Sequence, residues 1–231
     1  TNFPLHQTRG RLEALAVRGA PNIDLDQNAQ VGVRYPVVWV PISEADHEDD
    51  TDNRRDRVPG FTPNRVQAAD AGAAIFDRQE GMWASRATGK VYFDCTSGGR
   101  ANLGQVWEYD PWRQTLTLIY ESTSAEMLQS PDNMVIVPQT NDIFLQEDGD
   151  GEQFIRGVTL DGEIYNFAKT TDVNDSEFCG GCFDPDGETF YVNQQGERGV
   201  DSNGQPLSGV TPGVTYAIYG PFRKRGKSSK R

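Results

Sequence analysis

The sequence predicts an all-β protein that forms part of a β-propeller. Short runs rich in β-branched and aromatic residues alternate with turn sequences across residues 73–219, a pattern typical of short antiparallel strands. Groups of about four such runs recur with a period of roughly 45–50 residues, the spacing of propeller blades. A β-sandwich is also compatible with short strands and turns. The propeller is favoured because each group begins with an acidic residue.

The N-terminal part of the chain is less regular than the rest. Residues 11–17 nearly alternate apolar and polar side chains, which fits either a strand or a helical turn. Residues 31–40 favour a strand, and Pro36 and Pro41 would place its ends at a sheet edge or a bulge because proline cannot donate to a ladder.

A long polar, acidic loop is expected at residues 43–71. Loops of this length in compact domains are either functional or inserted. We expect a solvated loop, with a cation-binding loop as the alternative. Near its end, a helix is predicted around residues 64–74, capped by Thr62 and with Pro63 at its first position.

Three groups of strands follow this loop. Turn sequences such as Asp110-Pro111 and Pro185-Asp186-Gly187 separate the strands within each group. The predicted strands are 77–84, 90–96, 104–109 and 115–121 in the first group; 132–138, 142–146, 153–159 and 163–168 in the second; and 177–183, 189–194 and 214–219 in the third.

The acidic residues of successive groups are candidates for a metal site. The innermost strands of a propeller line a central channel, so residues at equivalent positions of its blades converge there. Crowded carboxylates repel one another, and hard cations such as calcium or iron(III) relieve that repulsion. Bound metals could then polarise a phosphate and generate hydroxide. The alternative is a set of acids at solvated strand ends. The candidate metal ligands are Glu80, Asp132, Glu147 and Glu177, and the candidate phosphate clamps are Arg78 and Arg156.

The three cysteines do not form a disulfide framework. Cys95 is expected to be a small buried side chain. Cys179 and Cys182 form one C-x-x-C, and strand alternation places them on opposite faces, which disfavours a disulfide unless the strand bulges. A disulfide and a metal or redox role remain the alternatives to two small strand residues. The two histidines, His6 and His47, lie in loop-like sequence and support neither a zinc site nor a Ser-His-Asp arrangement.

The distribution of charged residues indicates which classes of partner the chain can bind. The chain of 231 residues carries a net charge of −12, and six of its 22 basic residues lie in the last nine positions. An acidic body argues against nucleic acid as the main partner. The basic tail at 223–231 is expected to be disordered.

No apolar run is long enough for a transmembrane helix. Because the chain begins Thr1-Asn2 without methionine, we expect a fragment or processed chain.

A series of short motifs occurs in fixed order between residues 10 and 221. The motifs are 10–17, 80–83, 91–93 with 96–99, 104–111, 131–133, 147–149, 156–159, 177–178 with 185–187, 192–193 and 212–215. Singly each motif is weak, but the ordered set resembles the PhoX-like alkaline phosphatases, in particular the shorter branch of that family.

The resemblance implies a six-bladed propeller that hydrolyses phosphomonoesters with iron and calcium ions. Residues 1–222 would then be the C-terminal three blades and a remnant of a fourth. It further implies export by the twin-arginine route and a periplasmic, secreted or envelope-associated location. Glu80 and Glu177 resemble the iron-binding glutamates of the family, and Asp132 and Glu147 fall in segments that resemble ligand-bearing ones. The resemblance implies, less closely, that Arg156 would contact phosphate.

The chain also departs from the family pattern. The upstream part of the family propeller, which carries a cysteine ligand to iron, has no counterpart in the sequence. A companion N-terminal segment is therefore expected to complete the ring, because part of a propeller leaves sheet edges unpaired. Two alternatives stay open: a non-catalytic propeller that is a structural or binding module in a cell-envelope assembly, and a lactonase-like calcium propeller.

Overall fold

The computed structural model describes residues 10–43, 62–170, 176–196 and 213–222, and these confirm the predicted all-β class. They form thirteen strands and two short helices, with a propeller-like arrangement of antiparallel sheets. None of the described helices is long and apolar enough to cross a membrane. Most of the predicted acidic loop at 43–71 and the whole predicted tail at 223–231 lie outside the described residues.

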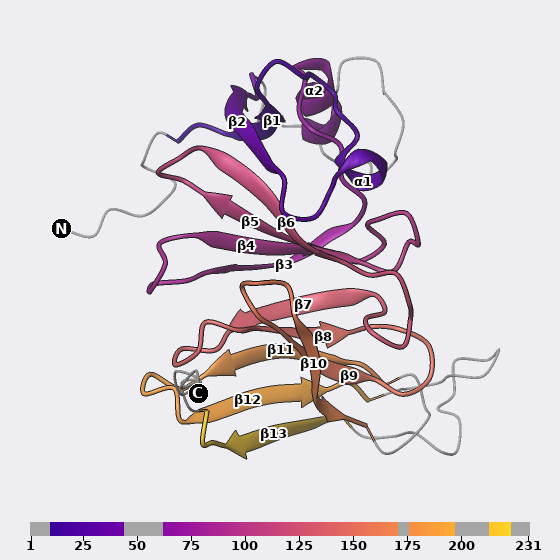
Figure 1. Cartoon of the computed structure of the whole chain (residues 1–231), viewed down its shortest axis with the longest axis vertical. Coiled ribbons are helices and arrows are strands. Elements are labelled where there is room, and N and C mark those ends of the chain that lie inside the picture. Colours follow the sequence, from indigo (N-terminus) through magenta and orange to yellow (C-terminus); the bar gives the residue numbers. More distant parts are fainter. Residues whose placement is uncertain (1–9, 44–61, 171–175, 197–212, 223–231) are drawn as a thin grey trace, which may run out of the picture.

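The strands form three sheets that stack one below another in Figure 1. We call β3–β6 blade 1, β7–β10 blade 2 and β11–β13 blade 3. The first sheet also includes β1 and β2, in the order β1-β2-β6-β5-β4-β3. The strands are β1 (Glu13–Val17), β2 (Arg34–Pro41), β3 (Gln79–Ala84), β4 (Val91–Cys95), β5 (Gln105–Asp110), β6 (Thr115–Glu121), β7 (Pro131–Ile136), β8 (Ile143–Glu147), β9 (Phe154–Val158), β10 (Ile164–Lys169), β11 (Phe178–Phe183), β12 (Thr189–Gln194) and β13 (Val214–Tyr219).

The first strands of the blades lie next to one another: β3 contacts β7, and β7 contacts β11. We call these three the inner strands. At the opposite edge of blade 1, β2 pairs with β6 through residues 34–36 and with β1 through residues 37–41. Each half of β2 therefore has one partner, which explains how a strand with prolines at positions 36 and 41 fits within a sheet.

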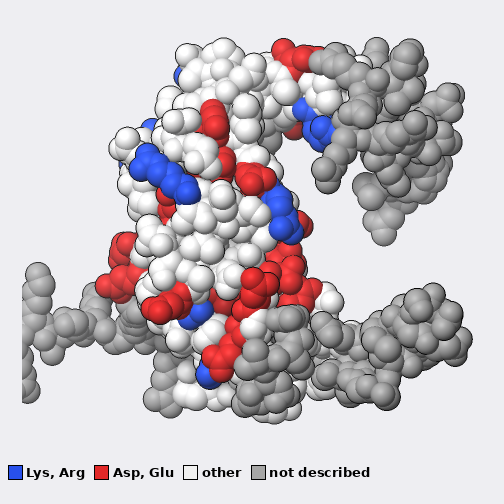
Figure 2. Space-filling model, turned by 90° about the vertical axis from the view of Figure 1, so that its right-hand side faces the viewer, with Lys and Arg blue, Asp and Glu red and all other residues white. Residues whose placement is uncertain are grey.

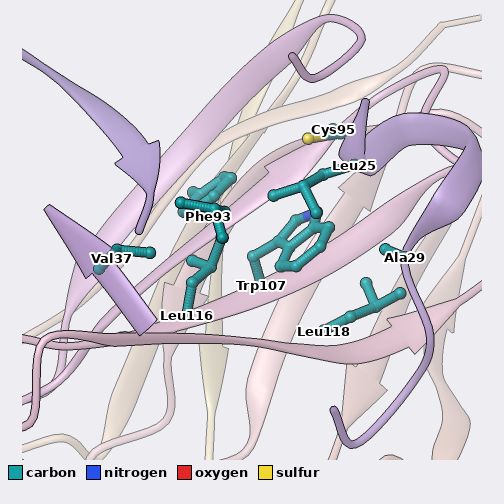
Figure 3. Close-up of a cluster of buried hydrophobic side chains, with 9 residues drawn as sticks. Leu25, Ala29, Val37, Phe93, Cys95, Trp107, Leu116 and Leu118 are labelled. Carbon is teal, nitrogen blue, oxygen red and sulfur yellow. The ribbon is translucent and has the colours of Figure 1, made fainter. Parts of the chain in front are cut away.

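The outer face of blade 1 is covered by β1, β2 and the short helix α1 (Leu25–Asn28). Trp107 lies at the centre of this core, fully buried and stacked on Phe93 with ring centroids 6.3 Å apart (Figure 3). Leu25 of α1 and Val37 of β2 complete the cluster. The indole N–H of Trp107 donates to the side chain of Gln105 at 3.2 Å, so no polar atom of the ring is left unpaired.

Two further apolar cores hold the blades together. The core between blades 1 and 2 includes Tyr92, Val106 and Met134. The core between blades 2 and 3 is aromatic: Phe144 and Phe190 meet edge to face at 5.5 Å. Alternating apolar residues on neighbouring strands thus bury both faces of blade 2.

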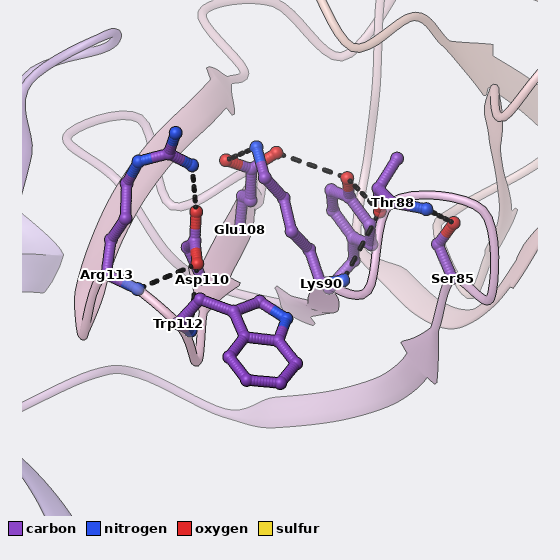
Figure 4. Close-up of polar contacts among 8 residues, drawn as sticks. Ser85, Thr88, Lys90, Glu108, Asp110, Trp112 and Arg113 are labelled. Atoms are coloured by element: carbon purple, nitrogen blue, oxygen red, sulfur yellow. Dashed lines mark hydrogen bonds and ion pairs between the residues drawn. The ribbon is translucent and has the colours of Figure 1, made fainter.

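The turn between β5 and β6 is closed by Asp110. Its carboxylate accepts hydrogen bonds from the backbone N–H groups of Trp112 and Arg113, both at 3.0 Å, and pairs with the Arg113 guanidinium at 2.8 Å (Figure 4). On the same side of the blade, Lys90 and Tyr92 both bind the Glu108 carboxylate, at 2.7 and 3.1 Å. The side chains of Asp110 and Glu108 thus stabilise the turn and the pairing of β4 with β5.

The predicted helix around residues 64–74 exists but is shorter and capped differently. It is α2 (Asn64–Asp70), and its N-cap is Pro63, with no side-chain capping hydrogen bond. The prediction that Thr62 caps it with Pro63 at the first position is therefore wrong by one residue. Proline fits the cap position because the cap backbone is not helical and its N–H is not needed.

All three inner strands contain a β-bulge. In each, one extra residue interrupts the pairing with the following strand, and the extra residue re-aims the side chains beside it. The irregularities lie between Gln79 and Met82 in β3, between Pro131 and Asn133 in β7, and between Cys179 and Cys182 in β11.

Candidate functional site

Glu80 and Asp132 occupy equivalent places in the bulges of two neighbouring inner strands. Glu80 lies in the bulge of β3, and Asp132 lies in the bulge of β7. Both are the second residue of their strand. Glu80 and Asp132 therefore occupy corresponding positions in successive blades, as predicted for the acidic residues.

Gly81 allows the two strands to approach at this point. A Cβ atom at Gly81 would lie 2.7 Å from the backbone nitrogen of Met134 in β7 and 2.6 Å from Asp94 Oδ2. Such distances exclude a side chain without movement of backbone. The glycine after Glu80 is thus required for the close contact between blades 1 and 2 at the end that carries the acids.

Asp94 is a buried acid of this site that the sequence analysis did not identify. It lies in β4 opposite the bulge, is fully buried, and accepts a hydrogen bond from the Gly81 N–H at 2.8 Å. Its Oδ2 atom has no hydrogen-bond partner among the described residues. Burial raises the pKa of Asp94 well above its usual range, the Gly81 N–H lowers it in part, and the carboxylates of Asp132 and Glu80 raise it further.

Glu177 lies one residue before β11 and is out of register with the other acids. The position in β11 that corresponds to Glu80 and Asp132 is Gly180, three residues further on. The prediction that Glu177 recurs in phase is therefore wrong, because the bulge of β11 lies deeper in the strand. Its backbone still pairs with the residue that follows β12, since the Gln195 N–H donates to the Glu177 carbonyl at 2.9 Å.

The electrostatic environment nevertheless links Glu177 to the acids of blade 2. Burial, followed by the charges of Asp148 and Asp132, raises the pKa of Glu177 from 4.5 to about 7. A hydrogen bond with the Asp148 side chain contributes to the same shift. Its carboxylate also accepts a hydrogen bond from the side chain of Gln195. Asp148 directly follows β8 and is a second acid that the sequence analysis missed.

Arg78 forms a long ion-pair contact with Glu80. Its guanidinium lies 3.9 Å from the Glu80 carboxylate, and both side chains are partly exposed, at 54% and 41%. The backbone of Arg78 is in the left-handed region, with φ of 49°, and its carbonyl accepts a hydrogen bond from Thr96 at 2.8 Å. A long, loosely paired contact of this kind leaves the guanidinium able to bind an anion.

Glu147 and Arg156 form a separate, internal ion pair. The Arg156 Nε atom lies 2.8 Å from Glu147, and each side chain is only 3% exposed. Arg156 also donates to the Asn166 side chain and lies over the Phe154 ring, 3.7 Å from its centroid. Burial raises the pKa of Glu147, while Arg156 and the Gln129 N–H lower it in part. This pairing gives both residues a structural role, and their predicted contacts with metal and phosphate would require the pair to open.

The donors at this site have the chemistry that hard cations prefer. Carboxylate oxygens ligate calcium and iron, and mutual repulsion raises the pKa of acids that share a site without a cation. The Oδ2 atom of Asp94 has no hydrogen-bond partner among the described residues, so it is a carboxylate oxygen available to ligate a cation. Among the side chains that the structure describes, however, no three His, Cys, Asp or Glu residues are grouped to hold a metal ion. Figure 2 shows acidic side chains gathered over the middle and lower parts of one face.

Comparison with known proteins identifies the family. A family model described as alkaline phosphatase PhoX matches residues 4–197, most of the chain. No curated protein matches the chain. A solved structure, Pseudomonas fluorescens PhoX in complex with vanadate, a transition state analogue, is similar with a TM-score of 0.59 and 18% sequence identity. At this identity, the similarity supports the fold alone.

The two chains differ in length. The similarity covers 91% of this chain and 44% of the Pseudomonas fluorescens protein. The chain described here therefore spans less than half the length of that structure.

Proposed function

Because the chain belongs to the alkaline phosphatase PhoX family, we propose that it forms part of a metal-dependent phosphomonoester hydrolase. The observation that supports this most strongly is the set of acids where β3, β4 and β7 meet. Glu80 and Asp132 lie in neighbouring bulges, and the charges of both raise the pKa of the buried Asp94, which has one oxygen without a hydrogen-bond partner among the described residues. A fold that keeps these acids together without a cation carries an electrostatic cost.

The residues of this chain that would hold the metals are the carboxylates of blades 1–3. We propose Glu80, Asp94, Asp132 and Glu177 as ligands to iron and calcium, because their oxygens suit hard cations. Bound metal would supply Lewis-acid polarisation of a phosphate and a hydroxide at moderate pH. Glu147 is the weakest of the predicted ligands, since Arg156 and Gln129 already bind its carboxylate.

Arg78 is the residue of this chain best placed to orient a phosphate. Its guanidinium is half exposed and lies 3.9 Å from Glu80, so it would be within reach of a phosphate bound beside that acid. A guanidinium matches two phosphate oxygens with two parallel N–H donors. Arg156 would take part only after its contact with Glu147 is broken.

A complete enzyme requires more than the described residues. The described acids form no three-ligand group, and the chain spans 44% of the structurally similar protein. We therefore propose that a companion segment supplies the remaining blades and ligands. Export by the twin-arginine route to the periplasm or cell envelope is part of the same proposal and rests on the family alone.

The test is elemental analysis of the purified chain together with any co-purified polypeptide, combined with hydrolysis of p-nitrophenyl phosphate. When the companion segment is present, we expect iron and calcium to be bound and the ester to be hydrolysed. Glu80→Gln should lose both bound metal and hydrolysis. Glu126→Gln, at an exposed acid outside the site, is the matched control and should change neither.

Two results would refute the proposal. One is a preparation that contains the companion segment, holds no metal, and remains inactive after iron and calcium are added back. The other is a Glu80→Gln variant that binds metal as the unmodified chain does. The first result, with a folded protein, would favour the alternative of a structural or binding module.

A further inference from the structure

Among the described residues, blade 3 has one strand fewer than blades 1 and 2. Each of those blades contains four consecutive strands, whereas blade 3 contains β11, β12 and β13, with β13 at its lower edge in Figure 1. The third strands of blades 1 and 2, β5 and β9, are paired on both sides. The corresponding strand of blade 3, β13, pairs with β12 alone. One long edge of β13 is therefore open within the part of the chain that the structure describes.

The register of β13 identifies which of its backbone groups lie on this open edge. The Gly220 N–H donates to the Glu188 carbonyl at 2.8 Å, so these residues form a hydrogen-bonded pair. Such pairs alternate with non-hydrogen-bonded pairs along an antiparallel ladder. Tyr216 and Ile218 therefore bond to β12, and the residues between and beside them direct their N–H and C=O groups to the open edge. We call these the edge residues; they are Thr215, Ala217 and Tyr219.

The described residues that follow β13 do not return along this edge. The Phe222 ring lies in the aromatic core between blades 2 and 3, 5.0 Å from the Phe183 ring and 6.0 Å from the Phe167 ring. The chain thus leaves the end of β13 toward blade 2. Positions 223–231 hold six Lys or Arg and no β-branched or aromatic residue, a composition that does not predict a strand.

The outer strand of blade 2 is only partly covered on the side of blade 3. Phe167 of β10 packs against the core between these blades without being fully buried, and a cavity of about 310 Å³ lies between Phe167, Phe144 and Phe222. The matching strand of blade 1 is β6, whose Ile119 is only 7% exposed in the core between blades 1 and 2. A fourth strand in blade 3 would cover β10 as blade 2 covers β6.

We propose that a strand of the companion segment pairs with the open edge of β13 and completes blade 3. The inference rests on the proposed function, which already requires a companion segment, and it specifies where that segment binds. The Pseudomonas fluorescens protein offers a source for such a strand, because this chain covers only 44% of its length. An extended strand that adds to a sheet edge gains main-chain hydrogen bonds along its whole length.

The open edge also defines the chemistry of the added strand. It should be about six residues long to match β13, and antiparallel to it, as β6 is to β5 and β10 is to β9. Every second side chain should be apolar, because the side chains level with Ile218 face the core between blades 2 and 3.

The test is hydrogen–deuterium exchange of the β13 amides, resolved to single residues and measured on two samples. One is the isolated chain, and the other is the preparation that contains the companion segment. In the isolated chain, the amides of Tyr216 and Ile218 should exchange slowly because they bond to β12, while those of the edge residues should exchange fast. In the preparation with the companion segment, exchange of the edge residues should slow by about tenfold or more.

Ala217→Pro and Ala217→Thr form a matched pair of variants. Ala217→Pro removes one N–H from the open edge and none of the bonds to β12, and edge strands tolerate proline at such positions. It should restore fast exchange at Thr215 and Tyr219 when the companion segment is present. Ala217→Thr keeps the N–H and should leave exchange slow. If urea unfolding shows that Ala217→Pro does not fold, the exchange of the unmodified chain decides the test.

Three results would overturn the inference. The first is fast exchange of the edge residues in the preparation with the companion segment. The second is slow exchange in the isolated monomer, because the partner would then belong to this chain, and the third is slow exchange only in a dimer of the isolated chain. Metal content and hydrolysis of p-nitrophenyl phosphate are measured on the same preparation. Slow exchange without metal and hydrolysis refutes the proposed function alone, and fast exchange with both refutes this inference alone.

Discussion

The buried ion pair of Glu147 and Arg156 offers the sharpest test of how this chain uses its charges. Each side chain is 3% exposed, and the pair is joined at 2.8 Å. If one partner of a buried pair is removed, the other remains as an uncompensated charge, which costs about 3–5 kcal/mol. Arg156→Met should therefore lower the free energy of unfolding by about that amount, because it leaves the Glu147 carboxylate buried without its guanidinium.

The double variant Glu147→Gln/Arg156→Met separates a structural pair from a functional one. It removes both charges, so it should cost less than either single change, with a coupling energy above about 1 kcal/mol. Urea unfolding followed by tryptophan fluorescence gives the three differences. A loss below about 1 kcal/mol for Arg156→Met would refute the structural role that burial implies. It would leave the predicted contact between this arginine and phosphate as the better explanation for its presence.

Three further changes test other parts of the structure. In metal-free protein, the raised pKa of Glu177, from 4.5 to about 7, means that the folded state holds an extra proton between those pH values. The protonated side chain therefore stabilises the folded state fully below about pH 4.5, and this stabilisation is lost as the pH rises through about 7. When the pH is raised from 5 to 8, the urea concentration at the unfolding midpoint should decrease less in Glu177→Gln than in the unmodified chain. Gly81→Ala should cost about 1–3 kcal/mol because its Cβ would lie 2.7 Å from the Met134 backbone, whereas Gly10→Ala, with nothing within 4 Å, should be neutral in the same unfolding assay. Trp107→Ala should cost about 3–5 kcal/mol through the cavity left in the core of blade 1, and an unchanged urea midpoint would contradict the packing described for it.

Most strands could be predicted from sequence because β-branched and aromatic runs between turn residues carry a strong signal. The predicted strands 115–121, 189–194 and 214–219 have the same bounds as β6, β12 and β13. The helices were harder to predict. The helix α1 has four residues and is capped by Asp24, whose side chain accepts a hydrogen bond from the Gln27 N–H, and so short a segment has no measurable periodicity.

Two acids of the candidate site could be selected from the sequence. Glu80 and Asp132 each stand near the start of a predicted group of strands, and the structure places them in neighbouring bulges. Asp94 lies in the sequence Val91-Tyr92-Phe93-Asp94-Cys95, where a charged residue within a buried strand was the available signal. Asp148 could not be separated from other acids of its turn, because its link to Glu177 depends on how blades 2 and 3 pack.

The bulges of the inner strands also matter to anyone who transplants blades between propellers. Beyond each bulge, the alternation of side chains between the two faces of the sheet is reversed. In a hybrid joined according to hydrophobic alternation, the side chains in the second half of the donor strand would therefore lie on the wrong face of the sheet. The bulge lies further from the start of the strand in β11 than in β7. It falls between Cys179 and Cys182 in β11, and between Pro131 and Asn133 in β7. A chimaera that replaces one of these strands with the other must therefore be joined at the bulge, and not at the first residue of the strand.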